Sequence, residues 1–270
     1  MIDGSNTSAF QRTLIVGLDG YMEYNGRKVE VTHVALEEDA ASILEEDKKN
    51  KTYKLNRLGV PLVEIGTGLL IGYTPEEVQE IAYLIGMTCR STGKVKRGIG
   101  TVRQDVNVSI RNGARVEVKG VQELGLLSKI IQSEVQRQMS VPKVNKEVRS
   151  ANPDGTTKFT RPLPGAARMY PETDIPPIPI DKKMIRKIKK NLPESWIKKM
   201  KRFKKKLRLS DELAKQIIRS EYLELFEKII KKYKISPSVA ANVFVSTLKD
   251  LKKRENIQVE KLEDKDFEEL

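Results

Sequence analysis

The stretch RGIGTVRQDVNVSIRNGARVEVK, residues 97–119, decides the fold of the first part of this chain. Apolar and polar residues alternate from 102 to 110, as in a half-buried strand. The apolar side is Val102, Val106, Val108 and Ile110, and the polar side is Arg103, Asp105, Asn107 and Ser109. A second strand is predicted over 115–119, and Asn112-Gly113 between them favours a hairpin because both residues tolerate positive φ.

The register of this hairpin determines which side chains share a face. A strict two-residue loop would place Ser109 opposite Val116 and mix apolar with polar residues, so a three-residue or bulged turn is expected. That turn sets Asn107 opposite Lys119 and Ser109 opposite Glu117. One polar face then carries Arg103, Asp105, Asn107, Glu117 and Lys119. Such a face is either a solvated sheet surface or a site.

Composition limits the classes of protein that the chain can represent. Its 270 residues are 39% hydrophobic and 32% charged, with one cysteine, Cys89, and one histidine, His33. These single residues argue against a disulfide framework, a histidine-rich metal cage and Ser-His-Asp chemistry within this chain. The apolar runs are too short to span a bilayer, and residues 1–10 do not resemble a signal peptide. A cytoplasmic protein without a membrane segment is expected.

The net charge of +13 is concentrated in one segment. Residues 182–208 hold fourteen Lys or Arg and one acid, Glu194, whereas 36 basic and 36 acidic residues balance in the rest of the chain. A concentrated basic patch is typical of a protein with a polyanionic partner such as nucleic acid. The alternative is a lysine-rich helix face that is simply solvated.

Two glutamates in predicted strands of the N-terminal region raise a further question. Strands are expected over 10–18, 21–24, 28–38 and 62–65. Glu38 continues an apolar row, and Glu64 lies inside a short apolar strand, so each carboxylate needs a partner. Glu38 could end a solvated strand and Glu64 could pair with Arg57. Alternatively, Glu38 and Glu64 converge on one divalent cation, which Mg²⁺ chemistry permits with two carboxylates.

The rest of the chain predicts helices and one irregular segment. Helices are expected from Thr74, with Thr as N-cap, and over 124–138. Residues 140–180 include most of the prolines and are expected to form a stiff, irregular connector. From residue 181 onward the pattern is helical. The fold class is therefore α+β: a mainly antiparallel domain with packed helices, residues 1–178, followed by an all-α domain, residues 179–270.

Several long motifs resemble one family. NRLGVPLVEI, RGIGTVRQDVNVSI, EVKGVQEL and RPLPGAARMYPETDIPPI, with DGSNTSAFQRT and LEEDAA, are similar to the archaeal glutamyl-tRNA(Gln) amidotransferase E subunits. The bacterial and organellar B subunits are more distant relatives. The resemblance implies a cradle-type catalytic domain that phosphorylates the γ-carboxyl of glutamate on tRNA(Gln) with ATP and then replaces phosphate by ammonia.

The same resemblance implies roles for particular residues. The metal ligands for Mg²⁺ would be Glu38 and Glu64, and the catalytic residues would be Arg103, Asp105, Asn107 and Lys119. ATP or substrate would contact Ser5, Asn6, Gln11, Arg12, Glu117, Arg168 and Glu172. The tRNA backbone would contact Lys198, Lys199, Lys201, Arg202, Lys204 and Lys205. Ammonia would come from an asparaginase-like D subunit.

The chain also departs from the family pattern. We expect it to lack an upstream first strand, a domain inserted between Gln138 and Arg161, and a C-terminal tail domain. Activity would then require a separate N-terminal half of the E subunit as well as the ammonia-producing partner. The rival hypothesis is a non-catalytic tRNA-binding or scaffold protein that kept the fold and lost the chemistry.

Overall fold

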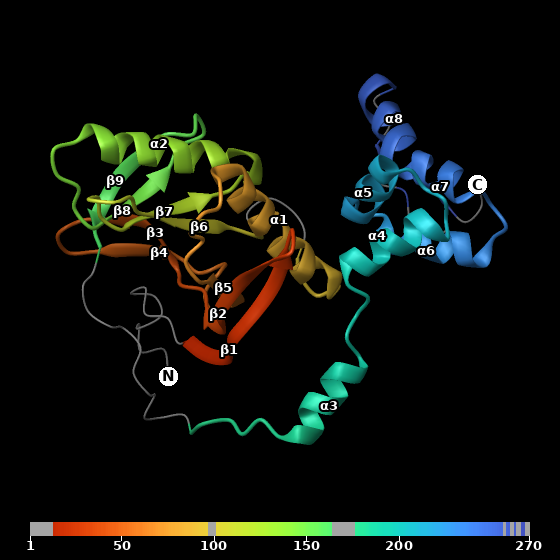
Figure 1. Ribbon diagram of the computed structural model, residues 1–270, viewed down its shortest axis with the longest axis horizontal. Helices are drawn as coiled ribbons and strands as arrows, with labels where there is room; N and C mark the ends of the chain where they lie inside the picture. The colour runs from red at the N-terminus through yellow and green to blue at the C-terminus, as the bar shows by residue number, and fades with distance from the viewer. Residues whose placement is uncertain are drawn as a thin grey trace. The chain divides into compact units, whose positions relative to one another are not determined.

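A computed structural model gives the architecture of the chain (Figure 1). The residues it describes are 13–96, 101–163, 176–255, 258–259, 262 and 266–267. The chain divides into two compact units, one formed by Met1–Tyr83 with Gly98–Ile178 and the other by Leu84–Arg97 with Pro179–Leu270. Strands and helices occur together in the first unit and helices alone in the described part of the second. The predicted α+β class is confirmed at this level, and the cradle-type arrangement stays a prediction.

The first sheet is antiparallel and contains β1 (Thr13–Tyr24), β2 (Arg27–Glu38) and β5 (Pro61–Thr67) in the order β1-β2-β5. β1 and β2 are joined at Asn25 and Gly26, whose φ angles are 48° and 75°. Two positive φ angles match the twist of a two-residue hairpin loop, and Asn-Gly is the pair of residues that adopts it most readily.

A short hairpin, β3 (Ser42–Glu46) with β4 (Lys51–Lys54), was not expected from the sequence. Its turn is closed by Asp47, whose Oδ1 accepts hydrogen bonds from the backbone N–H of Lys49 at 2.6 Å and of Asn50 at 2.7 Å. An Asp at the start of a turn is favoured for this reason.

The second large sheet has the order β6-β7-β8-β9. Its strands are β6 (Gln104–Val108), β7 (Val116–Val121), β8 (Glu147–Ala151) and β9 (Thr157–Pro162). β7 and β8 run parallel, and the other two neighbouring pairs run antiparallel. Figure 1 shows α2 lying along one face of this sheet.

The predicted register of the β6–β7 hairpin is wrong by two residues. Asn107 pairs with Glu117 and Val108 with Val116, whereas Lys119 was expected opposite Asn107. The loop is longer than expected, and its tight turn is made by Gly113 N–H donating to Ile110 O beside Asn112 at φ 65°. Because the shift is an even number of residues, the polar face predicted for the hairpin survives it.

Residues 147–162 are not the irregular connector that the prolines suggested. They form β8 and β9, joined by the turn Asn152-Pro153-Asp154-Gly155-Thr156. Asp154 Oδ1 accepts hydrogen bonds from the N–H of Thr156 at 2.9 Å and from its hydroxyl at 2.6 Å. Pro-Asp-Gly between two strands is a turn signal with a known mechanism, and here it outweighs the general tendency of proline to disrupt strands.

Two helices complete the first unit. α1 (Pro75–Ser91) begins with the expected capping box, in which Glu77 N–H donates to Thr74 Oγ1 and Thr74 N–H donates to the Glu77 carboxylate. The second half of α1 belongs to the other unit. A 3₁₀ turn, η1 (Leu124–Leu126), precedes α2 (Leu127–Ser140). The buried core against the sheet consists of Val116, Val118, Val121, Leu127 and Ile130.

The second unit contains α3 (Lys182–Lys190), α4 (Trp196–Lys205), α5 (Asp211–Arg219), α6 (Leu223–Lys232), α7 (Pro237–Asn242), the π-helical turn η2 (Val243–Thr247) and α8 (Leu248–Arg254). Phe203 of α4 and Phe226 of α6 are fully buried and meet edge to face, with ring centroids 5.5 Å apart. Such aromatic pairs stabilise helix packing beyond the area they bury. Among the described residues, no helix combines the length and apolar character needed to cross a bilayer.

Candidate functional site

A bulge in β7 shapes the polar face of the β6–β7 hairpin. Lys119 and Gly120 together stand opposite the single residue Asp105. Gly120 has φ 77°, a conformation that a side chain would strain, and its N–H donates to Asp105 Oδ1 at 3.0 Å. Bulges of this kind redirect neighbouring side chains, and this one fixes Asp105 beside Lys119.

Four of the five residues predicted for this face form a connected cluster of charges. Lys119 Nζ lies 3.1 Å from Glu117 Oε1 and 3.6 Å from Asp105 Oδ2, and Arg103 Nε lies 3.4 Å from Asp105 Oδ1. The side chains of Lys119 and Arg103 stay 41% and 60% exposed. Asn107 is exposed on the same face, opposite Glu117. The cluster therefore presents two cations that a dissolved anion can reach.

The strand register separates the two glutamates that were expected to share a cation. Glu64 of β5 pairs with Ala35 of β2, and Glu38 pairs with Pro61. Directly paired residues in an antiparallel sheet point to the same side, and successive residues alternate. Glu64 and Glu37 thus lie on one face and Glu38 on the other. The structural alternative for Glu64 also fails, because Arg57 Nε binds Asp39 Oδ2 at 2.5 Å.

Glu37 is the residue that sequence reasoning missed. Partial burial raises the pKa of Glu64, and the neighbouring charge and hydrogen bond of Glu37 raise it further. His33 and Lys119 act in the opposite direction. Thr13 Oγ1 donates to Glu37 Oε1 at 3.1 Å. The structure therefore brings Glu37 and Glu64 together and places Lys119 of the other sheet close enough to act on Glu64.

A carboxylate whose pKa is raised by a second carboxylate beside it is a common feature of cation sites, because a divalent ion removes the repulsion between the two groups. In the part of the chain that the structure describes, no three His, Cys, Asp or Glu side chains are arranged to hold a metal ion. This pair does not amount to an all-protein cage. It fits Mg²⁺, which keeps several waters and uses one or two carboxylates together with substrate phosphates.

A second carboxylate of the first unit is of a different kind. Glu134 of α2 is fully buried and accepts two hydrogen bonds from Arg137, at 2.7 and 2.8 Å, and one from Gln138 at 3.0 Å. Arg149 of β8 lies 3.7 Å away. Burial alone would raise the pKa of Glu134, but the hydrogen bonds from Arg137 and Gln138 outweigh it and the net shift is downward. This network fastens α2 to the sheet.

The six cations predicted to contact tRNA all lie on α4 and fall into two groups. Lys199 donates to Glu227 at 2.5 Å, Arg202 binds both Glu194 and Glu227, and Lys204 binds Asp211 at 2.7 Å. The other three are exposed and follow one another at helical spacing on one side of α4: Lys198, Lys201 and Lys205. Only this second group is available to an external anion without breaking an ion pair.

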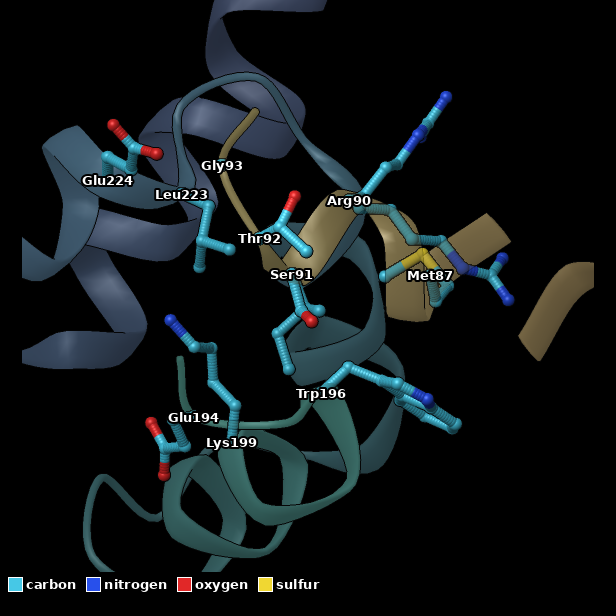
Figure 2. A pocket seen from close by; sticks show the side chains of 12 residues that line it. Met87, Arg90, Ser91, Thr92, Gly93, Glu194, Trp196, Lys199, Leu223 and Glu224 are labelled. Atoms are coloured by element: carbon cyan, nitrogen blue, oxygen red, sulfur yellow. The ribbon is translucent and has the colours of Figure 1, made fainter. Parts of the chain in front are cut away.

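The second unit also contains a cavity of about 180 Å³ between the end of α1 and helices α4 to α6 (Figure 2). Charged groups of both signs line it, among them Arg90, Lys199, Glu194 and Glu224, together with Trp196. With no single sign of charge, it has no clear preference for anionic or cationic ligands.

Six predicted site residues lie outside the described part of the chain: Ser5, Asn6, Gln11, Arg12, Arg168 and Glu172. Their assignments to ATP or substrate remain predictions from the resemblance.

Comparison with known proteins identifies relatives of the chain. A family model described as the GatB/GatE catalytic domain matches residues 1–186. The E subunit of the glutamyl-tRNA(Gln) amidotransferase of Methanocaldococcus jannaschii is 34% identical over 409 aligned positions, which cover the whole chain and 65% of that protein. The proteins of the same name from Methanococcus maripaludis and Saccharolobus islandicus are 32% and 33% identical, with 64% and 65% of their lengths covered.

The chain thus spans slightly less than two thirds of the length of these relatives. The alignments also run over 409 to 416 positions, whereas the chain has 270 residues. The relatives therefore contain residues inside the matched region that this chain does not have.

Proposed function

The chain belongs to the GatB/GatE catalytic domain family, and from this premise we propose that it is a catalytic portion of a glutamyl-tRNA(Gln) amidotransferase E subunit. In this proposal ATP phosphorylates the γ-carboxyl of glutamate attached to tRNA(Gln), giving an acyl phosphate and ADP. Ammonia then attacks the activated carbonyl and phosphate leaves, so that glutaminyl-tRNA is formed.

One observation carries the proposal: Glu37 of the first sheet and Lys119 of the second sheet both lie near enough to Glu64 to change its pKa. Phosphoryl transfer needs cations to neutralise phosphoryl oxygens and carboxylates to hold a metal ion. The two sheets supply both kinds of group. A merely solvated sheet surface would not need two carboxylates whose proximity raises the pKa of one of them.

Glu37 and Glu64 are the residues that would hold Mg²⁺, with Glu37 in place of the sequence-based choice of Glu38. When bound, the ion would supply positive charge to the phosphoryl oxygens and relieve the repulsion between the two carboxylates.

The remaining roles follow from contacts on the hairpin. Lys119 and Arg103 are exposed cations that can bind phosphoryl oxygens of ATP and the acyl phosphate. Asp105 orients both of them through its ion pairs and is itself fixed by Gly120 N–H. Asn107 and Glu117 border the same face and can hydrogen-bond to the glutamyl group or nucleotide.

The partners of this function are proposals as well. Free ammonia is scarce near neutral pH, so an asparaginase-like D subunit that produces it would assemble with this chain. Glutamate-charged tRNA(Gln) would contact the exposed cations of α4.

The test is ATP-dependent conversion of Glu-tRNA(Gln) to Gln-tRNA(Gln) by the reconstituted complex. We expect Glu64→Gln and Glu37→Gln to lower turnover at least about 100-fold, because each removes a carboxylate from the phosphoryl-transfer site. Glu38→Gln is the matched variant on the opposite face of β2 and should have a much smaller effect.

Two results would contradict the proposal. Equal turnover by wild type and Glu64→Gln would remove Glu64 from the mechanism. A complex that binds tRNA but converts none of it, with every partner present, would favour the non-catalytic scaffold.

A further inference from the structure

The single histidine of the chain, His33, lies on the face of the first sheet that carries Glu37 and Glu64. It has no role in the function proposed above. On β2, Val31 pairs with Thr67 and His33 pairs with Gly66, so Thr32 is an extra residue opposite β5. A bulge of this type bends the strand and redirects the side chains beside it. His33 is therefore placed by a local irregularity, which simple alternation along β2 does not predict.

Gly66 supplies the space that the imidazole occupies. A Cβ at residue 66 would overlap His33 Cε1 and would lie 2.7 Å from Nδ1 and 2.8 Å from Nε2. The ring thus rests directly on the backbone of β5. Any residue larger than glycine at position 66 would force the imidazole to move, because real side chains do not approach so closely.

Thr32 fixes which ring nitrogen carries the proton. Its hydroxyl donates its one hydrogen to Gly66 O at 3.1 Å and lies 3.0 Å from His33 Nδ1. When that hydrogen is donated to Gly66 O, Thr32 Oγ1 can only accept, and the hydrogen bond to His33 then requires a proton on Nδ1. The neutral imidazole then has its proton on Nδ1 and a lone pair on Nε2, as in many histidines whose Nδ1 is anchored to the protein.

The next residue on the same face of β5 is Glu64, two positions from Gly66. His33 and Glu64 are diagonal neighbours across the β2–β5 pair, a distance that long side chains bridge. Ala35, which pairs with Glu64, is small and leaves this diagonal open. The electrostatic effect of His33 on Glu64 agrees with this placement.

We propose that His33, anchored by Thr32 and seated on Gly66, is a positioning residue for Glu64. The imidazole limits the directions that the Glu64 carboxylate can take and presents Nε2 beside it. Glu64 is thereby directed toward Glu37 and Lys119. The effect of His33 on cation binding by Glu64 rests on the proposed function. The contact between His33 and Glu64 does not depend on that function.

The first test uses NMR of the full chain with ¹⁵N-labelled histidine. One histidine gives one set of ring signals. In the spectrum of the neutral ring we expect Nδ1 to carry the proton. Thr32→Val should shift the tautomer toward Nε2–H, whereas Thr52→Val, a matched change in β4, should not. A wild-type proton on Nε2 would overturn the proposal.

The second test asks whether His33 senses Glu64. Glu64→Gln should move the His33 ring resonances, and Glu38→Gln, on the other face of β2, should leave them in place. Folding of each variant is checked by circular dichroism. Unmoved His33 signals in a folded Glu64→Gln protein would reject the contact, whatever the protein does with a metal.

The third test measures binding of Mn²⁺ alone, by electron paramagnetic resonance of the free ion. We expect His33→Ala and Gly66→Ala each to weaken binding about 10-fold, the usual effect of losing a group that orients a ligand. The double variant should be no weaker than either single one, because both changes remove the same ring. Gly17→Ala, where a Cβ meets open space, is the control.

The tests keep the two proposals apart. Wild-type protein that binds no Mn²⁺ but shows the expected NMR results would count against the proposed cation site and leave the His33–Glu64 contact standing. Additive losses in the double variant would overturn the positioning role.

Discussion

Two glutamates of the first unit, Glu134 and Glu64, show how differently one side chain can be used. Glu134 is fully buried, and two arginines and a glutamine surround its carboxylate. Glu64 is accessible to solvent, and the charged group with the largest effect on its pKa is another carboxylate, Glu37. The pKa of Glu134 is lowered and that of Glu64 is raised.

The opposite pKa shifts separate a structural carboxylate from a functional one. Around Glu134 the protein supplies the compensating charge itself, and removal of that acid leaves Arg137 and Arg149 to share Glu147. Around Glu64 the compensation is incomplete, and the site is stabilised further by any cation that binds. An acid that the fold leaves undercompensated in an accessible position is a candidate for chemistry.

The largest expected effect comes from removing the buried acid. Glu134→Ala should lower the free energy of unfolding by about 3 kcal/mol, the lower end for breaking a buried ion pair, because Glu147 still pairs with both Arg137 and Arg149. Urea unfolding followed by circular dichroism measures this loss. Glu64→Gln is the matched change at the other acid and should leave stability equal or slightly higher. Equal losses in both proteins would contradict the distinction.

A smaller effect concerns pH, and the two acids should give opposite signs. Folded Glu134 binds its proton less tightly than the unfolded chain, so its contribution is present above the ordinary value of 4.5 and is lost as pH falls through the lowered pKa. Folded Glu64 binds its proton more tightly, so its contribution is present below 4.5 and is lost as pH rises through the raised pKa.

Urea unfolding at a series of pH values checks these signs. The stability advantage of wild type over Glu134→Gln should shrink below pH 4.5, and the stability of Glu64→Gln relative to wild type should grow above it. A change of the same sign for both variants would show that the two environments do not differ as described.

Strand patterns predicted which residues share the polar face of the hairpin, and the strand registers decided which glutamates lie together. The alternation from Arg103 to Asn107 placed the polar face of the hairpin correctly even though the register was two residues off, because a period of two is insensitive to an even shift. The choice between Glu37 and Glu38, in contrast, is sensitive to the register because the two residues are adjacent on the strand. A change of one residue selects the opposite face, and only the pairing of β2 with β5 shows which one meets Glu64.

The bulges and the long-range ion pairs could not be predicted from the sequence, because they too depend on residues that are far apart in the chain. The extra residues at Thr32 and Gly120 are defined by two strands together, so neither strand shows them alone. The Pro-Asp-Gly turn after Asn152, by contrast, carried a local signal that identifies the β8–β9 hairpin. Whether a cation of α4 is ion-paired or exposed depends partly on Glu227. This residue lies about 25 residues from Arg202, and no local pattern connects the two.

The smallest expected effect, on tRNA affinity, comes from α4. There too, some cations are paired with carboxylates of the protein and others are exposed. Changing Lys198, Lys201 and Lys205 together to Gln should weaken tRNA binding and reduce the slope of log affinity against log salt by up to about 3, one for each phosphate that is no longer neutralised. Stability should hardly change, since these side chains are exposed. Fluorescence anisotropy of labelled tRNA over a salt series measures both the affinity and the slope.

Arg202→Gln provides the contrasting variant, because Arg202 is held by Glu194 and Glu227. Those two ion pairs raise the pKa of its guanidinium, so the cation is committed to the fold. Its loss should lower the stability of the helical unit and change the salt slope little. If Arg202→Gln flattened the salt dependence while the triple lysine variant kept the wild-type slope, the compensated cation would be the one that binds RNA, and the division between structural and functional charges would fail on α4.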